Sequence, residues 1–226
     1  MNIYKLFITI CLVAVSSSIY CMKKQSALHD AAYYGDLFAL RTILISDQTP
    51  DDKYDDNCGQ TALGLLVDSQ NAKGQTALML AAAAGHVNIV DALVHTYNAS
   101  ITIIDSKEQT ALHYVAQKGK GRRKDRRRIA TLLLKKGASV HARSLLGFTP
   151  LHNAIKSNQI NIAQVLLQHN ADLEIEDITG STPLDYARAK QMVALFGKSY
   201  KKGTYYQSTL ARKKIADDLV ESPTLG

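Results

Sequence analysis

The sequence predicts an all-α fold, a solenoid of stacked helix-turn-helix units joined by extended turns. A short phrase, Thr followed by Ala or Pro and then Leu, recurs at Thr76, Thr110, Thr149 and Thr182. The steps between these threonines are 34, 39 and 33. Self-similarity at a period of about 33 residues is typical of stacked helical repeats. Gly or Asn also recurs at fixed places after the apolar segments. One such unit cannot bury both of its helices, so the units must stack to form a core.

The segment 74–107 illustrates the predicted unit. Thr76 is expected to begin a helix, because its hydroxyl can accept a hydrogen bond from a free amide of the first turn. Residues 77–84 are apolar and mostly small, so this inner helix can lie close to its neighbours. Gly85 is expected to end it, since glycine adopts the left-handed conformation at little cost.

A second, outer helix is predicted over residues 87–95, with Val and Leu side chains on its buried side. Asn98 is expected to close this helix, because Asn tolerates the left-handed conformation better than most residues. Residues 99–107 remain for an extended turn. The same helix-ending residues recur along the chain. The positions between two predicted helices are Gly35, Gly85, Gly119 and Asn158. The positions that end an outer helix, each followed by Ala, are Asn98, Gly137 and Asn170.

These phrases, and above all Thr149-Pro150-Leu151-His152, resemble the ankyrin repeat, whose period is about 33 residues. The resemblance implies a repeat domain over 24–197, with units at about 24–58, 59–73, 74–107, 108–146, 147–179 and 180–197. Terminal repeats are expected to be atypical because one face meets water. In the last unit Leu184-Asp185 replaces Leu-His, and this unit is expected to act as a cap.

The unit at 59–73 does not fit the period. Gly59-Gln60-Thr61-Ala62-Leu63 begins only fifteen positions before its near copy at Gly74. That spacing leaves room for one helix, about 62–70, without a partner. We interpret the segment as a unit that has lost its outer helix; the alternative is an irregular insert.

Residues 1–21 are predicted to be a cleaved signal peptide, which makes the protein secreted or exported. Lys5 precedes an unbroken apolar stretch, 6–15, and three serines follow it. This layout is typical of secretory signals, and the stretch is too short to span a bilayer. An uncleaved membrane anchor and a lipoprotein modified at Cys21 are the alternatives, although Tyr20 fits a lipidation site poorly. No transmembrane span is expected in the mature chain.

The net charge of +7 is concentrated in one segment, 118–128. Ile129 follows Gly119 by ten residues, whereas Ile89 follows Gly85 by four, so six residues are predicted to be inserted as a loop between two helices. A loop insertion costs little because closure entropy grows slowly with length. The basic residues are Lys118, Lys120, Arg122, Arg123, Lys124, Arg126, Arg127 and Arg128.

Three interpretations of this basic insert stay open. It is a solvated loop with no partner, an electrostatic patch for nucleic acid or an anionic membrane surface, or a nuclear import signal. The insert contains no aromatic residue for base stacking, which argues against sequence-specific nucleic-acid binding.

No pattern in the chain indicates catalysis, a metal site or a cofactor. The sequence lacks G-x-S-x-G, P-loop, H-E-x-x-H and C-x-x-C motifs. His29, His113 and His152 are interpreted as structural, since the resemblance places them at the start of inner helices. The aspartates at 47, 51, 52, 55 and 56 lack the EF-hand order, and Cys58 is interpreted as a lone thiol. The protein is therefore not expected to be an enzyme.

The resemblance implies a protein-binding surface along the turn tips and the exposed side of the inner helices. The positions are Ser106, Lys107, Gln109, Gln117, Lys118, Leu145, Leu146, Phe148, Lys156, Ile178, Thr179 and Ser181. Four of them are apolar (Leu145, Leu146, Phe148 and Ile178), and a contiguous exposed apolar patch marks an interface. The alternative is that these side chains fold back and seal the joints between units.

Residues 198–226 are interpreted as a basic tail, with a possible amphipathic helix at 211–220. The predicted function is that of a non-catalytic protein-binding module in an exported, monomeric protein, whose partner the sequence does not name. This architecture is similar to that of ankyrin proteins that host-associated bacteria export toward host proteins. The alternative function is an electrostatic adaptor that binds nucleic acid or an anionic surface through 118–128.

Overall fold

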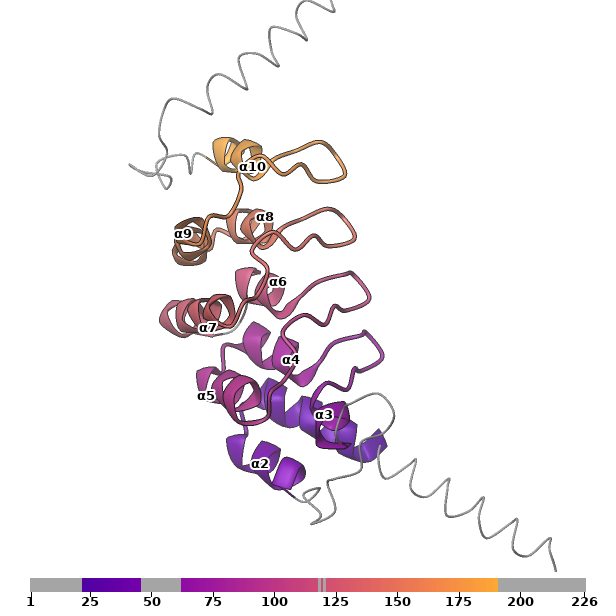
Figure 1. Cartoon of the computed structure of the whole chain (residues 1–226). Coiled ribbons are helices and arrows are strands. Elements are labelled where there is room, and N and C mark those ends of the chain that lie inside the picture. Colours follow the sequence, from indigo (N-terminus) through magenta and orange to yellow (C-terminus); the bar gives the residue numbers. More distant parts are fainter. Residues whose placement is uncertain (1–21, 46–61, 118, 120, 191–226) are drawn as a thin grey trace, which may run out of the picture.

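The computed structural model describes residues 22–45, 62–117, 119 and 121–190, which form a single row of stacked helix pairs (Figure 1). Inner helices lie in the middle of the row, outer helices on one side, and hairpin-like loops, here called fingers, project on the other. These residues contain helices, turns and extended segments but no β-strand. The predicted all-α repeat solenoid is confirmed.

The first helix pair consists of residues 22–34 and α2 (Leu37–Ile45). Gly35 separates the two helices with a φ of 88°, as predicted for that slot. A single helix, α3 (Ala62–Val67), follows. It is shorter than the predicted 62–70 helix. Residues 46–61 lie outside the described part, so the interpretation of 59–73 as a truncated unit stays a prediction.

The inner helix α4 (Ala77–Ala84) has the predicted bounds and the predicted caps. The Thr76 side chain accepts a hydrogen bond from the Met79 amide, and Gly85 ends the helix with a φ of 85°. Nearly all of α4 is buried because its Ala, Leu and Met side chains are packed between neighbouring helices. The cap and the small side chains therefore explain both where this helix starts and how closely it packs.

The outer helix of this unit differs from the prediction. Residues 87–95 were expected to form one α-helix, but α5 (Val87–Asp91) continues as the π-helix η1 (Ala92–Thr96). Ala99 N–H donates to Leu93 O, six residues back, whereas Ala138 and Ala171 donate to Leu133 and Leu166, five residues back. The step from Thr76 to Thr110 is one residue longer than the step from Thr149 to Thr182, and the π-helix accommodates that residue.

The next unit corrects the prediction for the basic insert. The inner helix α6 (Ala111–Ala116) ends early, and Gln117 is extended (ψ 166°), so Gly119 does not end this helix as Gly85 ends α4. The outer helix α7 (Arg123–Lys135) is 13 residues long, whereas the outer helix α9 (Ile160–Gln168) has nine. Most of the insert is thus not a loop but a longer outer helix.

The following unit has the inner helix α8 (Pro150–Lys156) and the outer helix α9, and α10 (Pro183–Ala189) is the last described helix. Asn98, Asn158 and Asn170 have φ values of 51°, 55° and 61°, which confirms their predicted left-handed conformation. The predicted signal peptide (1–21), the end of the predicted cap (191–197), the predicted tail (198–226) and the predicted helix at 211–220 lie outside the described residues.

The core is one continuous cluster of Leu, Ile, Val and Ala side chains that runs through the row. Adjacent fingers are joined by equivalent backbone hydrogen bonds: Ser106 N–H to Lys73 O (3.1 Å), Leu145 N–H to Lys107 O (2.9 Å) and Ile178 N–H to Leu146 O (3.2 Å). In the part of the chain described, every helix is too short or too polar to cross a membrane.

Candidate binding surfaces

Each finger is braced by a polar residue five positions before the recurring Thr. Asp105 Oδ1 accepts hydrogen bonds from the amides of Lys107 (2.9 Å) and Gln109 (2.7 Å). Asp177 Oδ1 accepts from the amides of Thr179 (2.8 Å) and Ser181 (3.1 Å). Such side-chain-to-backbone bonds fix a turn. The sequence analysis missed these residues, although their constant offset from the Thr, shared by Asn71 and Ser144, is a usable signal.

Tyrosine hydroxyls from the inner helices form hydrogen bonds with the aspartates that brace the fingers. Tyr114 donates to Asp105 Oδ2 (2.6 Å) and accepts from the Gln75 side chain of the preceding unit (2.8 Å). Burial, with the hydrogen bond to Asp105, raises the pKa of Tyr114 to about 12. Tyr186 donates to Asp177 Oδ2 (2.7 Å). Burial alone would raise the pKa of Asp177, but hydrogen bonds from Thr179, Tyr186 and Ser181 lower it to about 2.

The three histidines tie consecutive units together. His152 Nδ1 accepts from the Thr149 amide (3.1 Å), and His152 Nε2 donates to Ser181 O in the next unit (3.2 Å). His113 has the same arrangement with Thr110 and Phe148 O. His29 Nε2 lies 3.1 Å from Ser69 O and 3.0 Å from Gln75 O. His113 and His152 lie at the start of inner helices as predicted, whereas His29 lies inside helix 22–34 and not at its start. The ring nitrogens of all three form hydrogen bonds that hold the fold, which agrees with their structural interpretation.

These bonds predict a loss of stability in mild acid. Burial lowers the pKa of both His113 and His152 below 6.5, and protonated Nδ1 could not accept from the Thr amide. As pH falls below about 6.5, the unfolded chain takes up protons that the folded chain does not, so the free energy of unfolding decreases. The urea midpoint should therefore be lower at pH 5.5 than at pH 7.5, and the difference should shrink in His152→Gln. Equal midpoints would contradict the prediction.

The predicted protein-binding residues divide between exposed and packed positions. Seven are exposed: Ser106, Lys107, Leu145, Leu146, Lys156, Ile178 and Thr179. Gln109, Gln117, Phe148 and Ser181 are half-buried, and Lys118 lies outside the described residues. The finger tips thus carry most of the exposed positions.

Phe148 does not stand on a finger tip as an exposed side chain. Its ring centroid lies 5.7 Å from that of His152 and 6.2 Å from that of Tyr186, and the Lys156 ammonium lies 3.9 Å above the ring. Phe148 therefore helps to seal a joint between units, which was the alternative interpretation for the apolar residues.

Three apolar side chains do remain exposed on two neighbouring fingers: Leu145 at 60%, Leu146 at 49% and Ile178 at 66%. Lys156 is also exposed and lies over the ring of Phe148, which follows Leu145 and Leu146 in the chain. We call Leu145, Leu146, Phe148, Lys156 and Ile178 the finger surface. It combines an apolar centre with a cation, and large apolar patches of this kind are rare on surfaces that only face water.

One residue of the basic insert is buried, which the sequence analysis did not foresee. Arg126 is 1% exposed. Its guanidinium donates to the backbone carbonyls of Tyr114, Val115 and Gln117. These carbonyls belong to the end of α6 and the residue after it, where a helix has no intrahelical donors for its last carbonyls. Arg126 thus caps α6 from the neighbouring outer helix.

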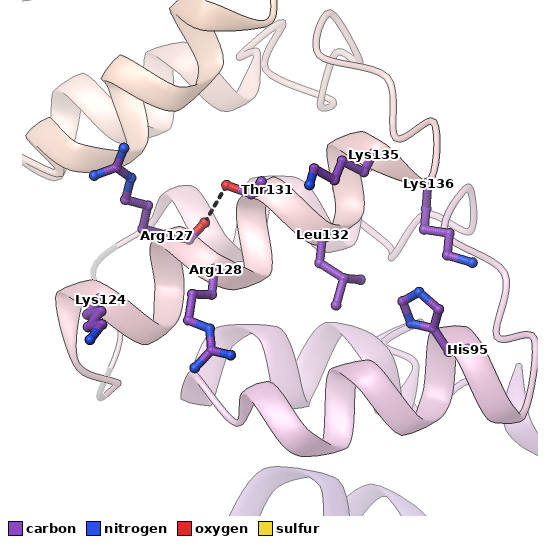
Figure 2. A pocket seen from close by; sticks show the side chains of 8 residues that line it. All are labelled: His95, Lys124, Arg127, Arg128, Thr131, Leu132, Lys135 and Lys136. Carbon is purple, nitrogen blue, oxygen red and sulfur yellow. Dashed lines mark hydrogen bonds between the residues drawn. The ribbon is translucent and has the colours of Figure 1, made fainter.

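Four other basic side chains of α7 (Lys124, Arg127, Arg128 and Lys135) line an open groove beside α5 and η1 (Figure 2). The groove has a volume of about 530 Å³ and is lined by His95, Lys124, Arg127, Arg128, Thr131, Leu132, Lys135 and Lys136. We call these residues the basic groove. Of the predicted insert residues, Arg122 and Arg123 are exposed but do not line it, and Lys118 and Lys120 lie outside the described part.

The described ranges hold no group of three His, Cys, Asp or Glu side chains that could bind a metal ion. Cys58 and the aspartates at 47–56 lie outside these ranges.

Comparison with known proteins agrees with this geometry. A model described as ankyrin repeats (3 copies) matches residues 28–144, and one described as ankyrin repeats (many copies) matches 133–187. Inversin from Canis lupus familiaris is 32% identical over 143 residues, which is 63% of this chain and 11% of that protein. Ankyrin repeat domain-containing protein 53 from Macaca fascicularis is 32% identical over 39% of this chain and 18% of its own length.

A probable serine/threonine-protein kinase from Dictyostelium discoideum is 30% identical over 44% of this chain and 11% of that protein. The matched segments thus span less than a fifth of each of these relatives. Stacked helix pairs with braced fingers define a repeat protein of the kind that binds other proteins. The chain belongs to the ankyrin repeat family, whose members are generally non-catalytic interaction modules.

Proposed function

We propose that this chain is the partner-binding module of an exported protein, and that the finger surface receives the partner. The observation that carries the proposal is the exposure of Leu145, Leu146 and Ile178 on adjacent, braced fingers. Braced fingers lose little conformational entropy on binding, which favours affinity. Lys156, which lies over the Phe148 ring in the same finger surface, favours a partner that carries an acidic group as well as apolar residues.

The proposal that the protein is exported rests on residues 1–21. Their positive charge, apolar stretch and small residues match a secretory signal. An exported binding protein acts on targets outside the cell that makes it, and we propose a host-directed effector role on this ground. N-terminal sequencing of the mature product tests this step. The expected product begins near residue 22, and an intact Met1 on protein recovered from the producing cells alone would overturn export.

The binding step is tested by affinity capture of partners with the mature chain, followed by a triple variant. Leu145→Ser, Leu146→Ser and Ile178→Ser together should abolish capture while leaving the thermal midpoint nearly unchanged, because all three side chains are exposed. The matched control changes Phe38, Ile45 and Leu65 to Ser; they are also exposed, at 82%, 56% and 45%, but lie on other elements. Equal capture by the two triple variants would reject the finger surface as the site.

A further inference from the structure

The basic groove lies on the side of the solenoid opposite the fingers, since α7 belongs to the outer row (Figure 1). We propose that it binds the sugar–phosphate backbone of a nucleic-acid duplex without reading the bases. This inference goes beyond the proposed function, because it concerns another face and another class of partner.

The charge of the groove is dense and of one sign. Five of its eight lining residues are cationic (Lys124, Arg127, Arg128, Lys135 and Lys136), and none is acidic. At its edge, Asp91 pairs with His95 at 3.3 Å. Five cations along α7 and its C-terminal cap, with no acidic side chain in the lining, repel one another and attract a polyanion.

The spacing of the cations suits a duplex. Lys124 and Lys136, the first and last of the five cations, are twelve residues apart along α7 and its C-terminal cap, which corresponds to about 18 Å at about 1.5 Å per residue. One strand of a duplex presents a phosphate about every 3.4 Å along the axis, so about five phosphates fall within that length. The number of cations therefore matches the number of phosphates that the helix can face.

The chemistry of the lining argues against other polyanionic partners. Single-stranded nucleic acid is usually held by aromatic side chains that stack on bases, and no Phe, Tyr or Trp lines this groove. The centres of protein interfaces are depleted in charge. A flat lipid surface would meet only one side of α7, whereas Arg127 and Arg128 extend to opposite sides of it (Figure 2).

The test is fluorescence anisotropy with the full chain and a labelled 20-base-pair duplex of arbitrary sequence at several salt concentrations. Five phosphate contacts predict a slope of about −4.5 for the logarithm of affinity against the logarithm of salt concentration, at about −0.9 per contact. The variant Arg127→Gln, Arg128→Gln, Lys135→Gln should reduce the slope to about −1.8. At 0.1 M salt it should bind roughly 500-fold more weakly, since each contact contributes about eightfold there.

The control variant changes Lys23, Arg41 and Lys73 to Gln. These exposed residues lie outside the groove, and the total charge changes by the same amount. The control should keep both the slope and most of the affinity, and circular dichroism should show both variants folded. Equal losses in both variants, a wild-type slope shallower than about −2, or tighter binding to anionic vesicles or polyglutamate than to the duplex would each overturn the proposal.

Discussion

Replacing Arg126 by Met is expected to lower the free energy of unfolding by roughly 3 kcal/mol, measured by urea denaturation. Met fills most of the volume of the arginine stem, so the loss reports on the hydrogen bonds rather than on packing. The carbonyls of Val115 and Gln117 would lose their charged donor, and a buried acceptor left without a donor costs about 1–3 kcal/mol. Two such carbonyls account for the expected loss.

Two further variants separate this effect from a general effect of charge. Arg126→Lys should recover part of the stability, because an ammonium can reach one of the carbonyls but cannot reproduce the planar guanidinium fork. Arg127→Met, one position away and exposed, should change stability by no more than about 0.5 kcal/mol. If Arg126→Met and Arg127→Met have equal effects, Arg126 does not cap α6.

Replacing Gly121 by Ala should destabilise the protein by about 2–3 kcal/mol, because overpacking a close backbone contact typically costs about 1–3 kcal/mol. A β-carbon on Gly121 would lie 2.6 Å from Gly85 Cα and 2.8 Å from Ala84 O. Both are backbone atoms, so no side chain can move aside. The basic segment would have to shift away from the preceding unit, and Arg126 would move with it.

The matched control is Gly180→Ala. Gly180 has a φ of 76° and open space around its would-be β-carbon, so Ala there costs only the left-handed backbone, about 1–2 kcal/mol. Thermal denaturation of both variants gives the comparison. A smaller loss for Gly121→Ala than for Gly180→Ala would show that the insert does not pack tightly on Gly85.

The sequence predicted the helix ends correctly where a single capping residue or left-handed Gly or Asn determines them. Thr76 and Gly85 determine the ends of α4, and Asn98 and Asn170 have the left-handed conformation that the pattern required. The histidines were recognised as structural for the same reason, since the Thr-Pro-Leu-His phrase specifies a local capping geometry. The all-α solenoid then follows from repetition.

Contacts between different helices, within and between units, were less visible in the sequence. Arg126 looks like any other charge in a basic run, and only the neighbouring α6 carbonyls make it a buried cap. Phe148 was expected on a finger tip, but Tyr186 of the next unit and Lys156 of its own inner helix pack against it. The bracing carboxylates of Asp105 and Asp177 were missed, although their offset from Thr110 and Thr182 is constant. These roles depend on which residues the stack brings together.

The equivalent hydrogen bonds between fingers have a consequence for evolution. The recurring threonines are unequally spaced, yet each unit returns the chain to the same finger-to-finger bond, because a π-helix and a lengthened α7 accommodate the extra residues on the outer side. Insertions can therefore accumulate on the outer-helix side of such a protein without changing the regular spacing of the fingers on the other side. The outer-helix side can thus evolve a new binding task while the fingers on the opposite side keep their positions relative to one another.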